Sequence, residues 1–121
     1  MEQCGSKLFE ELKKTGVEVE KTISRFMDNS DIYITFLKRF PDEDKITPIR
    51  DAVSEKDFEK LSQTAHKLKG VSANLGMTGL SEAAHRLELQ AKNKSDENIG
   101  ENLELTEKLY GEICRIIKEN T

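Results

Sequence analysis

The feature that most restricts the fold is the spacing of apolar residues, which recur every three or four positions along most of the chain. This spacing gathers side chains on one face of an α-helix. In the C-terminal segment the recurring positions are Ile99, Leu103, Thr106, Tyr110, Ile113 and Ile117. Alternating apolar and polar runs are missing, and only two prolines interrupt the 121 residues. We therefore predict an all-α protein.

Capping residues divide the chain into predicted helices. Serine, threonine, aspartate and asparagine favour the position before a helix, because their side chains accept hydrogen bonds from its first N–H groups. The expected caps are Ser6, Ser30, Ser54 in a capping box with Asp57, Thr78 and Ser95. The helices that they open are expected to end near residues 15, 40, 75, 93 and 119, and a further helix is expected over residues 17–27.

Glycine and proline give further boundaries. Gly76 is suited to end the helix that begins at Ser54, because glycine readily adopts the left-handed conformation found after helices. Pro41 and Pro48 leave two possibilities for residues 30–53. This stretch is either one kinked helix or two pieces, the second of which is capped by Thr47.

The number of amphipathic helices predicts the architecture. Four of them joined by short loops favour an antiparallel four-helix bundle, which we place at residues 30–120. Residues 1–29 would then pack against it as additional helical segments. A chain of 121 residues has the size of one domain, so we expect a single domain over residues 1–121.

Composition excludes several classes of protein. The formal net charge is −4, whereas a non-specific nucleic-acid binder normally carries a basic excess. No stretch approaches 18 consecutive apolar residues, and the N-terminus lacks the pattern of a signal peptide. Cys4 and Cys114 belong to no CxxC pattern and are interpreted as free thiols. We therefore expect a cytoplasmic protein that binds neither nucleic acid nor membrane.

One of the two histidines is predicted to face solvent from the helix at residues 54–75. At about 100° per residue, His66 lies roughly 150° from the centre of the apolar stripe of that helix. Lys69 and Gly70 follow one turn later on the same side. Glycine inside a helix costs roughly 1 kcal/mol relative to alanine. A glycine on an outer face therefore suggests that another molecule must approach closely there.

The next predicted helix carries a second polar group. His85 lies roughly 140° and Glu88 roughly 80° from its apolar stripe. On antiparallel neighbouring helices, these side chains could meet His66 and Lys69. A carboxylate beside an imidazole accepts the Nδ1–H hydrogen bond and leaves Nε2 free to attack an electrophilic phosphoryl group. The lysine would offset charge on the phosphate oxygens.

The segment around His66 resembles the signature of histidine-containing phosphotransfer (Hpt) domains. That signature reads roughly A-H-x-L-K-G-x-[SA]-x-x-[LI]-G, and residues 65–76 read AHKLKGVSANLG. The resemblance implies a four-helix bundle in which His66 accepts a phosphoryl group on Nε2 and passes it on. Lys69 corresponds to the phosphate-side lysine, and Gly70 to the glycine that leaves room for a partner domain.

The second helix of the site resembles another branch of the family. His85 and Glu88 occupy positions at which the Hpt-type domain of chemotaxis histidine kinases also has histidine and glutamate, whereas many relay domains carry glutamine at the position of Glu88. One alternative is therefore a phosphoacceptor domain detached from a larger chemotaxis-like kinase. Our preferred hypothesis is a stand-alone phosphorelay intermediate between two receiver domains.

The resemblance also implies partners and cofactors. The chain contains neither a P-loop nor a glycine-rich kinase loop, so we expect a phosphohistidine carrier rather than a kinase. No cofactor of its own is expected, and the Mg²⁺ needed for transfer would belong to the partner receiver domain. The expected partners are receiver domains of response regulators, a hybrid histidine kinase, or both.

Two other functions are compatible with parts of the pattern. His66, His85 and Glu88 could be three ligands of a zinc centre. A lysine beside the site would oppose a cation, and the chain lacks the repeated Glu-x-x-His motif of di-iron bundles. A non-catalytic helical adaptor would explain the apolar stripes. It would leave Gly70 and the outward-facing histidine without a reason.

Overall fold

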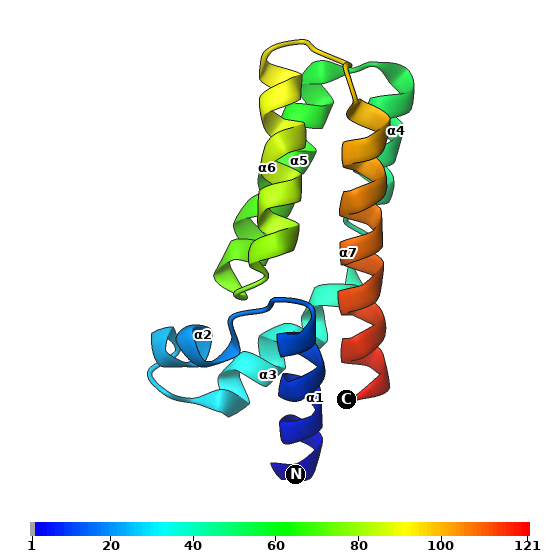
Figure 1. The fold of residues 1–121 in the computed structure, drawn as a ribbon. Coiled ribbons are helices and arrows are strands. Elements are labelled where there is room, and N and C mark those ends of the chain that lie inside the picture. The colour runs from blue at the N-terminus through cyan, green and yellow to red at the C-terminus, as the bar shows by residue number, and fades with distance from the viewer. Residues whose placement is uncertain (1) are drawn as a thin grey trace.

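Three long helices and one shorter helix form an upright bundle in this computed structural model, which describes residues 2–121 and side chains from Ser6 onward (Figure 1). These helices are α4 (Thr47–Glu55), α5 (Phe58–Asn74), α6 (Thr78–Lys92) and α7 (Ile99–Glu119). The remaining elements are α1 (Glu2–Lys14), α2 (Val19–Arg25), α3 (Ser30–Arg39) and the 3₁₀ helix η1 (Phe40–Asp42). No strand occurs among the described residues, and the all-α prediction is confirmed.

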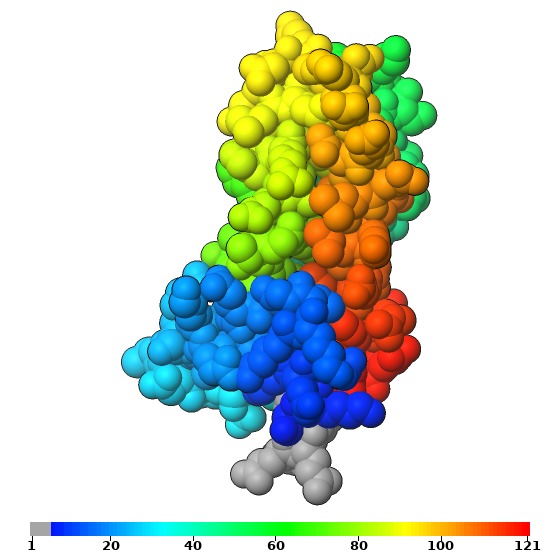
Figure 2. Space-filling model, in the orientation of Figure 1, coloured from blue at the N-terminus to red at the C-terminus, as the bar shows by residue number. Residues whose placement is uncertain are grey.

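The N-terminal helices gather at one end of the bundle. Figures 1 and 2 show α1, α2 and α3 at the end opposite the loop between α6 and α7. Two hydrogen bonds tie them to the turn between α5 and α6. The backbone N–H of Glu18 donates to the carbonyl of Gly76 at 2.9 Å, and the buried hydroxyl of Tyr33 donates to the carbonyl of Leu75 at 2.8 Å.

The turn after α5 depends on glycine at position 76. Gly76 has φ +77°, so the prediction of a left-handed residue there is confirmed. A Cβ atom at this position would overlap Oγ1 of Thr22 and lie 3.0 Å from the carbonyl oxygen of Glu18. Glycine therefore meets two requirements here, a left-handed backbone and the close approach of α2.

The stretch at residues 30–53 forms two separate α-helices, α3 and α4, which decides between the two possibilities left by the prolines. The side chain of Asp44 accepts hydrogen bonds at the start of the second helix, α4. Its Oδ1 accepts hydrogen bonds from the backbone N–H groups of Ile46 and Thr47 at 3.0 Å, and its Oδ2 accepts one from the hydroxyl of Thr47 at 2.6 Å. Thr47 is thus the first residue of α4, and the prediction that it is the cap was wrong.

Two other predicted caps were wrong because a neighbouring side chain does the capping. Oδ1 of Asn29 accepts a hydrogen bond from the N–H of Ile32, so Ser30 lies inside α3. Oδ1 of Asp57 accepts one from the N–H of Lys60. Ser54 belongs to α4, which ends at Glu55 and is followed by the left-handed residue Lys56. In both cases a side chain that reaches the third following N–H sets the start of the helix.

The remaining three predicted caps were also misplaced. α1 begins at Glu2, before Ser6, and α6 begins with Thr78 itself after Met77. α7 begins at Ile99, four residues after Ser95. Ser95 instead closes the end of α6, because its N–H donates to the carbonyl of Gln90 at 2.9 Å.

The cysteines and the helix hydropathy add two observations. Cys114 is a free, half-buried thiol, and burial raises its pKa. The predicted free thiol at Cys4 lies outside the described side chains. Within residues 2–121, no helix combines the length and the apolar character that crossing a membrane requires.

Candidate functional site

His66 projects from the outer face of α5. Its side chain is 66% exposed, whereas Leu61, Ala65 and Leu68 of the same helix are buried. The helix therefore separates two faces, as the apolar stripe predicts. The inner face packs into the bundle and the outer face presents one imidazole to solvent.

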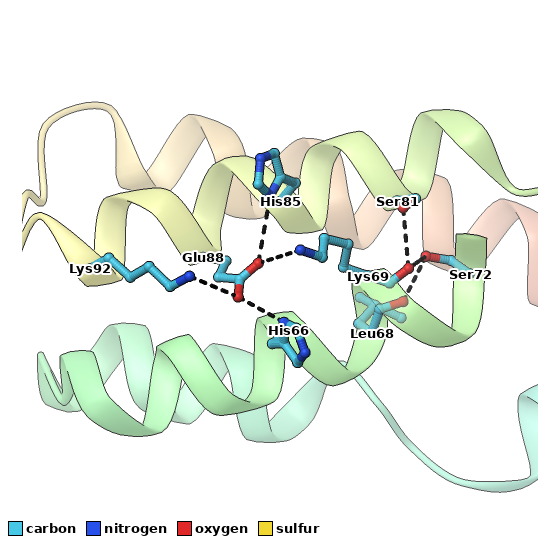
Figure 3. Close-up of polar contacts among 8 residues, drawn as sticks. All are labelled: His66, Leu68, Lys69, Ser72, Ser81, His85, Glu88 and Lys92. Carbon is cyan, nitrogen blue, oxygen red and sulfur yellow. Dashed lines mark hydrogen bonds and ion pairs between the residues drawn. The ribbon is translucent and has the colours of Figure 1, made fainter. Parts of the chain in front are cut away.

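Glu88 of α6 is hydrogen-bonded to one nitrogen of that imidazole. Nδ1 of His66 lies 2.8 Å from Oε2 of Glu88, whose side chain is only 3% exposed (Figure 3). An ionised carboxylate accepts hydrogen bonds and donates none, so the proton of a neutral His66 resides on Nδ1. The lone pair is then on Nε2, the nitrogen that does not face Glu88.

Several cations keep Glu88 charged. Burial by itself raises the pKa of Glu88, but the contacts with Lys69 and His66 and the charge of Lys92 outweigh it and bring the pKa to about 2. Nζ of Lys69 lies 2.9 Å from Oε1, and Nζ of Lys92 lies 3.5 Å from Oε2. Glu88 is thus a carboxylate throughout the physiological pH range.

We predict that Glu88 makes stability depend on acidity in a defined range. Because its folded pKa lies below the ordinary 4.5, the unfolded chain binds a proton between about pH 4.5 and pH 2 that the folded chain does not. Its stabilising contribution, about 3 kcal/mol, is complete above pH 4.5 and is lost as the pH falls towards 2. Denaturant unfolding of wild-type protein and Glu88→Gln should therefore give free energies that converge over this range. Curves that stay parallel would contradict the assignment.

The site contains the residues singled out from the sequence and one more. His85 is about half exposed, and its Nδ1 lies 3.5 Å from Oε1 of Glu88. His66, Lys69 and His85 therefore surround a single carboxylate. Sequence reasoning missed Lys92, although its position four residues after Glu88 on the same helix was a usable signal.

Backbone contacts fix the helix beside His66. The hydroxyl group of Ser72 donates to the carbonyl oxygen of Leu68 at 2.6 Å and lies 3.2 Å from that of Lys69. The hydroxyl group of Ser81 donates to the carbonyl oxygen of Lys69 at 3.1 Å (Figure 3). Ser81 belongs to α6, so this contact joins the two helices of the site. At Gly70, a Cβ atom would meet nothing within 4 Å. The surface one turn beyond His66 is therefore open, and the packing of this chain does not require glycine there.

The arrangement of donors does not fit a metal centre. Within the described residues, no group of three or more histidine, cysteine, aspartate or glutamate side chains is arranged to hold a metal ion. Lys69 and Lys92 also direct their ammonium groups at Glu88, the one carboxylate of the cluster. These cations take the place that a metal would need.

Comparison with known protein families identifies the family of this chain. Residues 31–115 match the family model described as Hpt domain. The chain belongs to the Hpt domain family, whose members are phosphotransfer domains that interact with receiver domains in phosphorelays. No curated protein matched the chain as a relative.

A solved structure shares the fold. The crystal structure of histidine-containing phosphotransfer protein B (HptB) from Pseudomonas aeruginosa PAO1 matches with a TM-score of 0.75 and 23% sequence identity. The match covers 85% of this chain and 91% of that chain. At this identity the similarity concerns the fold, and the roles of individual residues depend on the geometry described above.

Proposed function

We propose that His66 accepts a phosphoryl group from the aspartyl phosphate of one receiver domain and delivers it to the aspartate of another. The observation that carries this proposal is the contact between His66 and Glu88. It joins an exposed imidazole to a buried, ionised carboxylate through Nδ1 and leaves Nε2 as the nucleophile.

The transfer balances without an external proton donor. The Nε2 lone pair forms a bond to phosphorus while the bond from phosphorus to the aspartyl oxygen breaks. The electron pair of that bond leaves on the aspartate of the receiver. The ring then carries both the phosphoryl group on Nε2 and the proton on Nδ1, and the negative charge of Glu88 stabilises this cation. The reverse sequence phosphorylates the next receiver.

Lys69 and Lys92 support this chemistry through charge. Both ammonium groups contact Glu88, beside His66. We propose that they keep Glu88 ionised and that Lys69 also offsets the negative charge of the phosphoryl oxygens. His85 contacts Oε1 of Glu88, whereas His66 contacts Oε2. His85 is proposed as a positioning residue that helps to fix the carboxylate.

The chain needs no cofactor of its own for these steps. In this proposal the Mg²⁺ belongs to the receiver domain, where it neutralises charge on the aspartyl phosphate. The donor is a hybrid histidine kinase or a response regulator, and the exchange takes place in the cytoplasm.

We predict that Gly70→Gln slows transfer from a phosphorylated receiver at least tenfold without unfolding the protein. The new side chain enters open space, so the fold is kept, and helix propensity should stabilise it by about 0.5–1 kcal/mol. Transfer slows because the side chain occupies the approach to His66. The matched control is Gly111→Gln on α7, which also enters open space. Equal transfer rates for both variants would contradict the role of Gly70 in partner access.

A further inference from the structure

An apolar groove with cationic groups in its lining lies at the corner between α2 and α3, against the C-terminal part of α5. It has a volume of about 560 Å³. Its apolar lining consists of Phe26, Phe36 and Phe40 together with Val71 of α5 and Leu75, which follows the end of α5. Arg25, Arg39 and Lys45 complete the lining.

Two aromatic residues of the groove, Phe26 and Phe36, pack against neighbouring rings. Phe26 contacts both the buried Tyr33 and the outer Phe36, with ring centroids 5.7 and 5.6 Å apart. Phe36 remains 43% exposed, and the guanidinium of Arg39 lies 5.8 Å from the centre of its ring. Aromatic and arginine side chains of this kind are the common anchors of protein interfaces.

The corner itself presents another apolar side chain to solvent. Met27 is 90% exposed, and Met27 and Asp28 both have a left-handed backbone, with φ of 58° and 59°. Such a conformation costs roughly 1–2 kcal/mol for each residue other than glycine. Arg25, Phe26 and Met27 precede the segment at residues 31–115 that matches the Hpt family.

The groove and His66 are separated by a short distance along α5. Val71 and Asn74, which line the groove, lie five and eight residues after His66 on α5, or about 8 and 12 Å along the helix axis. A typical interface buries about 800 Å² on each partner, which corresponds to a patch of about 16 Å radius. A docked patch of this radius centred on His66 extends along α5 as far as Val71 and Asn74, where the groove begins.

Charge indicates which partner fits. The chain carries a net charge of −4, yet all the ionisable groups that line this groove are cations. We propose that the groove is a specificity-determining surface for the receiver domain, and that it binds an exposed apolar side chain flanked by acidic residues. This inference rests on the proposed function of His66.

The test compares two phosphoryl donors on the same variants. Phosphoramidate is a small donor that needs no docking surface, whereas a receiver domain needs one. The receiver to use is the one that labels His66 fastest in a panel from the genome that encodes this chain. Phe36→Ala and Arg39→Glu are the test variants. Leu105→Ala and Lys108→Glu are matched controls on exposed positions of α7 outside the groove.

We expect both test variants to react normally with phosphoramidate and at least tenfold more slowly with the receiver, measured as kcat/KM. Both controls should match the wild-type protein. Replacing one acidic surface residue of the receiver with lysine should restore transfer to Arg39→Glu, which a merely structural effect would not do.

Two results would overturn the proposal. If Phe36→Ala and Arg39→Glu transfer from the receiver as fast as the controls, the groove does not contact it. If sedimentation then shows that the groove joins two copies of this chain, the conclusion is the same: the groove does not bind the receiver. If neither donor labels His66 in the wild-type protein, the proposed function fails first and the docking proposal fails with it.

Discussion

Replacing His66 with glutamine is expected to abolish phosphoryl labelling while the fold is retained. Glutamine has no ring nitrogen that can attack phosphorus, so the acceptor itself is removed. The side chain at this position is exposed and contributes one hydrogen bond, to Glu88. Stability should therefore change by less than about 1 kcal/mol. Labelling by a phosphorylated receiver, together with thermal unfolding, measures both effects.

His85→Gln is the matched control for this experiment. His85 is also an exposed histidine in contact with Glu88, and it is the only other histidine of the chain. We expect this variant to be labelled, with a modest change in rate because one contact of Glu88 is lost. If His85→Gln removed the label and His66→Gln retained it, the assignment of the acceptor would be reversed.

The largest effect on stability is expected from Gly76→Ala. The left-handed backbone costs about 1–2 kcal/mol for a residue with a Cβ atom, and the overlap with Thr22 adds about 1–3 kcal/mol. The sum is about 3 kcal/mol, a large part of the stability of a small domain. Denaturant unfolding would show it as a lower midpoint with an unchanged slope.

Gly16→Ala separates the two contributions. Gly16 has a similar left-handed φ of +87°, but a Cβ atom there would meet nothing within 4 Å. This variant should lose only the 1–2 kcal/mol that the backbone conformation costs. Equal losses for Gly16→Ala and Gly76→Ala would show that the close approach of α2 to the turn contributes nothing.

The parts of the fold that depend on periodicity could be predicted from the sequence. The apolar spacing predicted the all-α class and the outward orientation of His66. The left-handed conformation that glycine readily adopts predicted the turn at position 76. The N-cap residues of the helices could not be predicted reliably, because several residues with capping side chains are adjacent in the sequence. Asn29 precedes Ser30, and a shift of one residue decides which side chain reaches a free N–H group.

The burial of Glu88 could not be predicted from its own helix. At roughly 80° from the apolar stripe, a side chain lies at the border between core and solvent, and the packing of α5 decides its exposure. The contact with Lys92 could have been predicted, because Lys92 lies four residues after Glu88 on the same helix. Sequence spacing brings such groups to one face but does not determine which atoms meet.

The central claim is that Nε2 of His66 carries the phosphoryl group, and mapping the acid-labile product tests it most directly. The wild-type protein is incubated with a phosphorylated receiver domain, digested under alkaline conditions that preserve phosphohistidine, and sequenced by mass spectrometry. We predict a single phosphorylated site at His66, with ³¹P NMR showing attachment through Nε2. A phosphoryl group on another residue, or on Nδ1 of His66, would contradict the account, since Nδ1 is the nitrogen that faces Glu88.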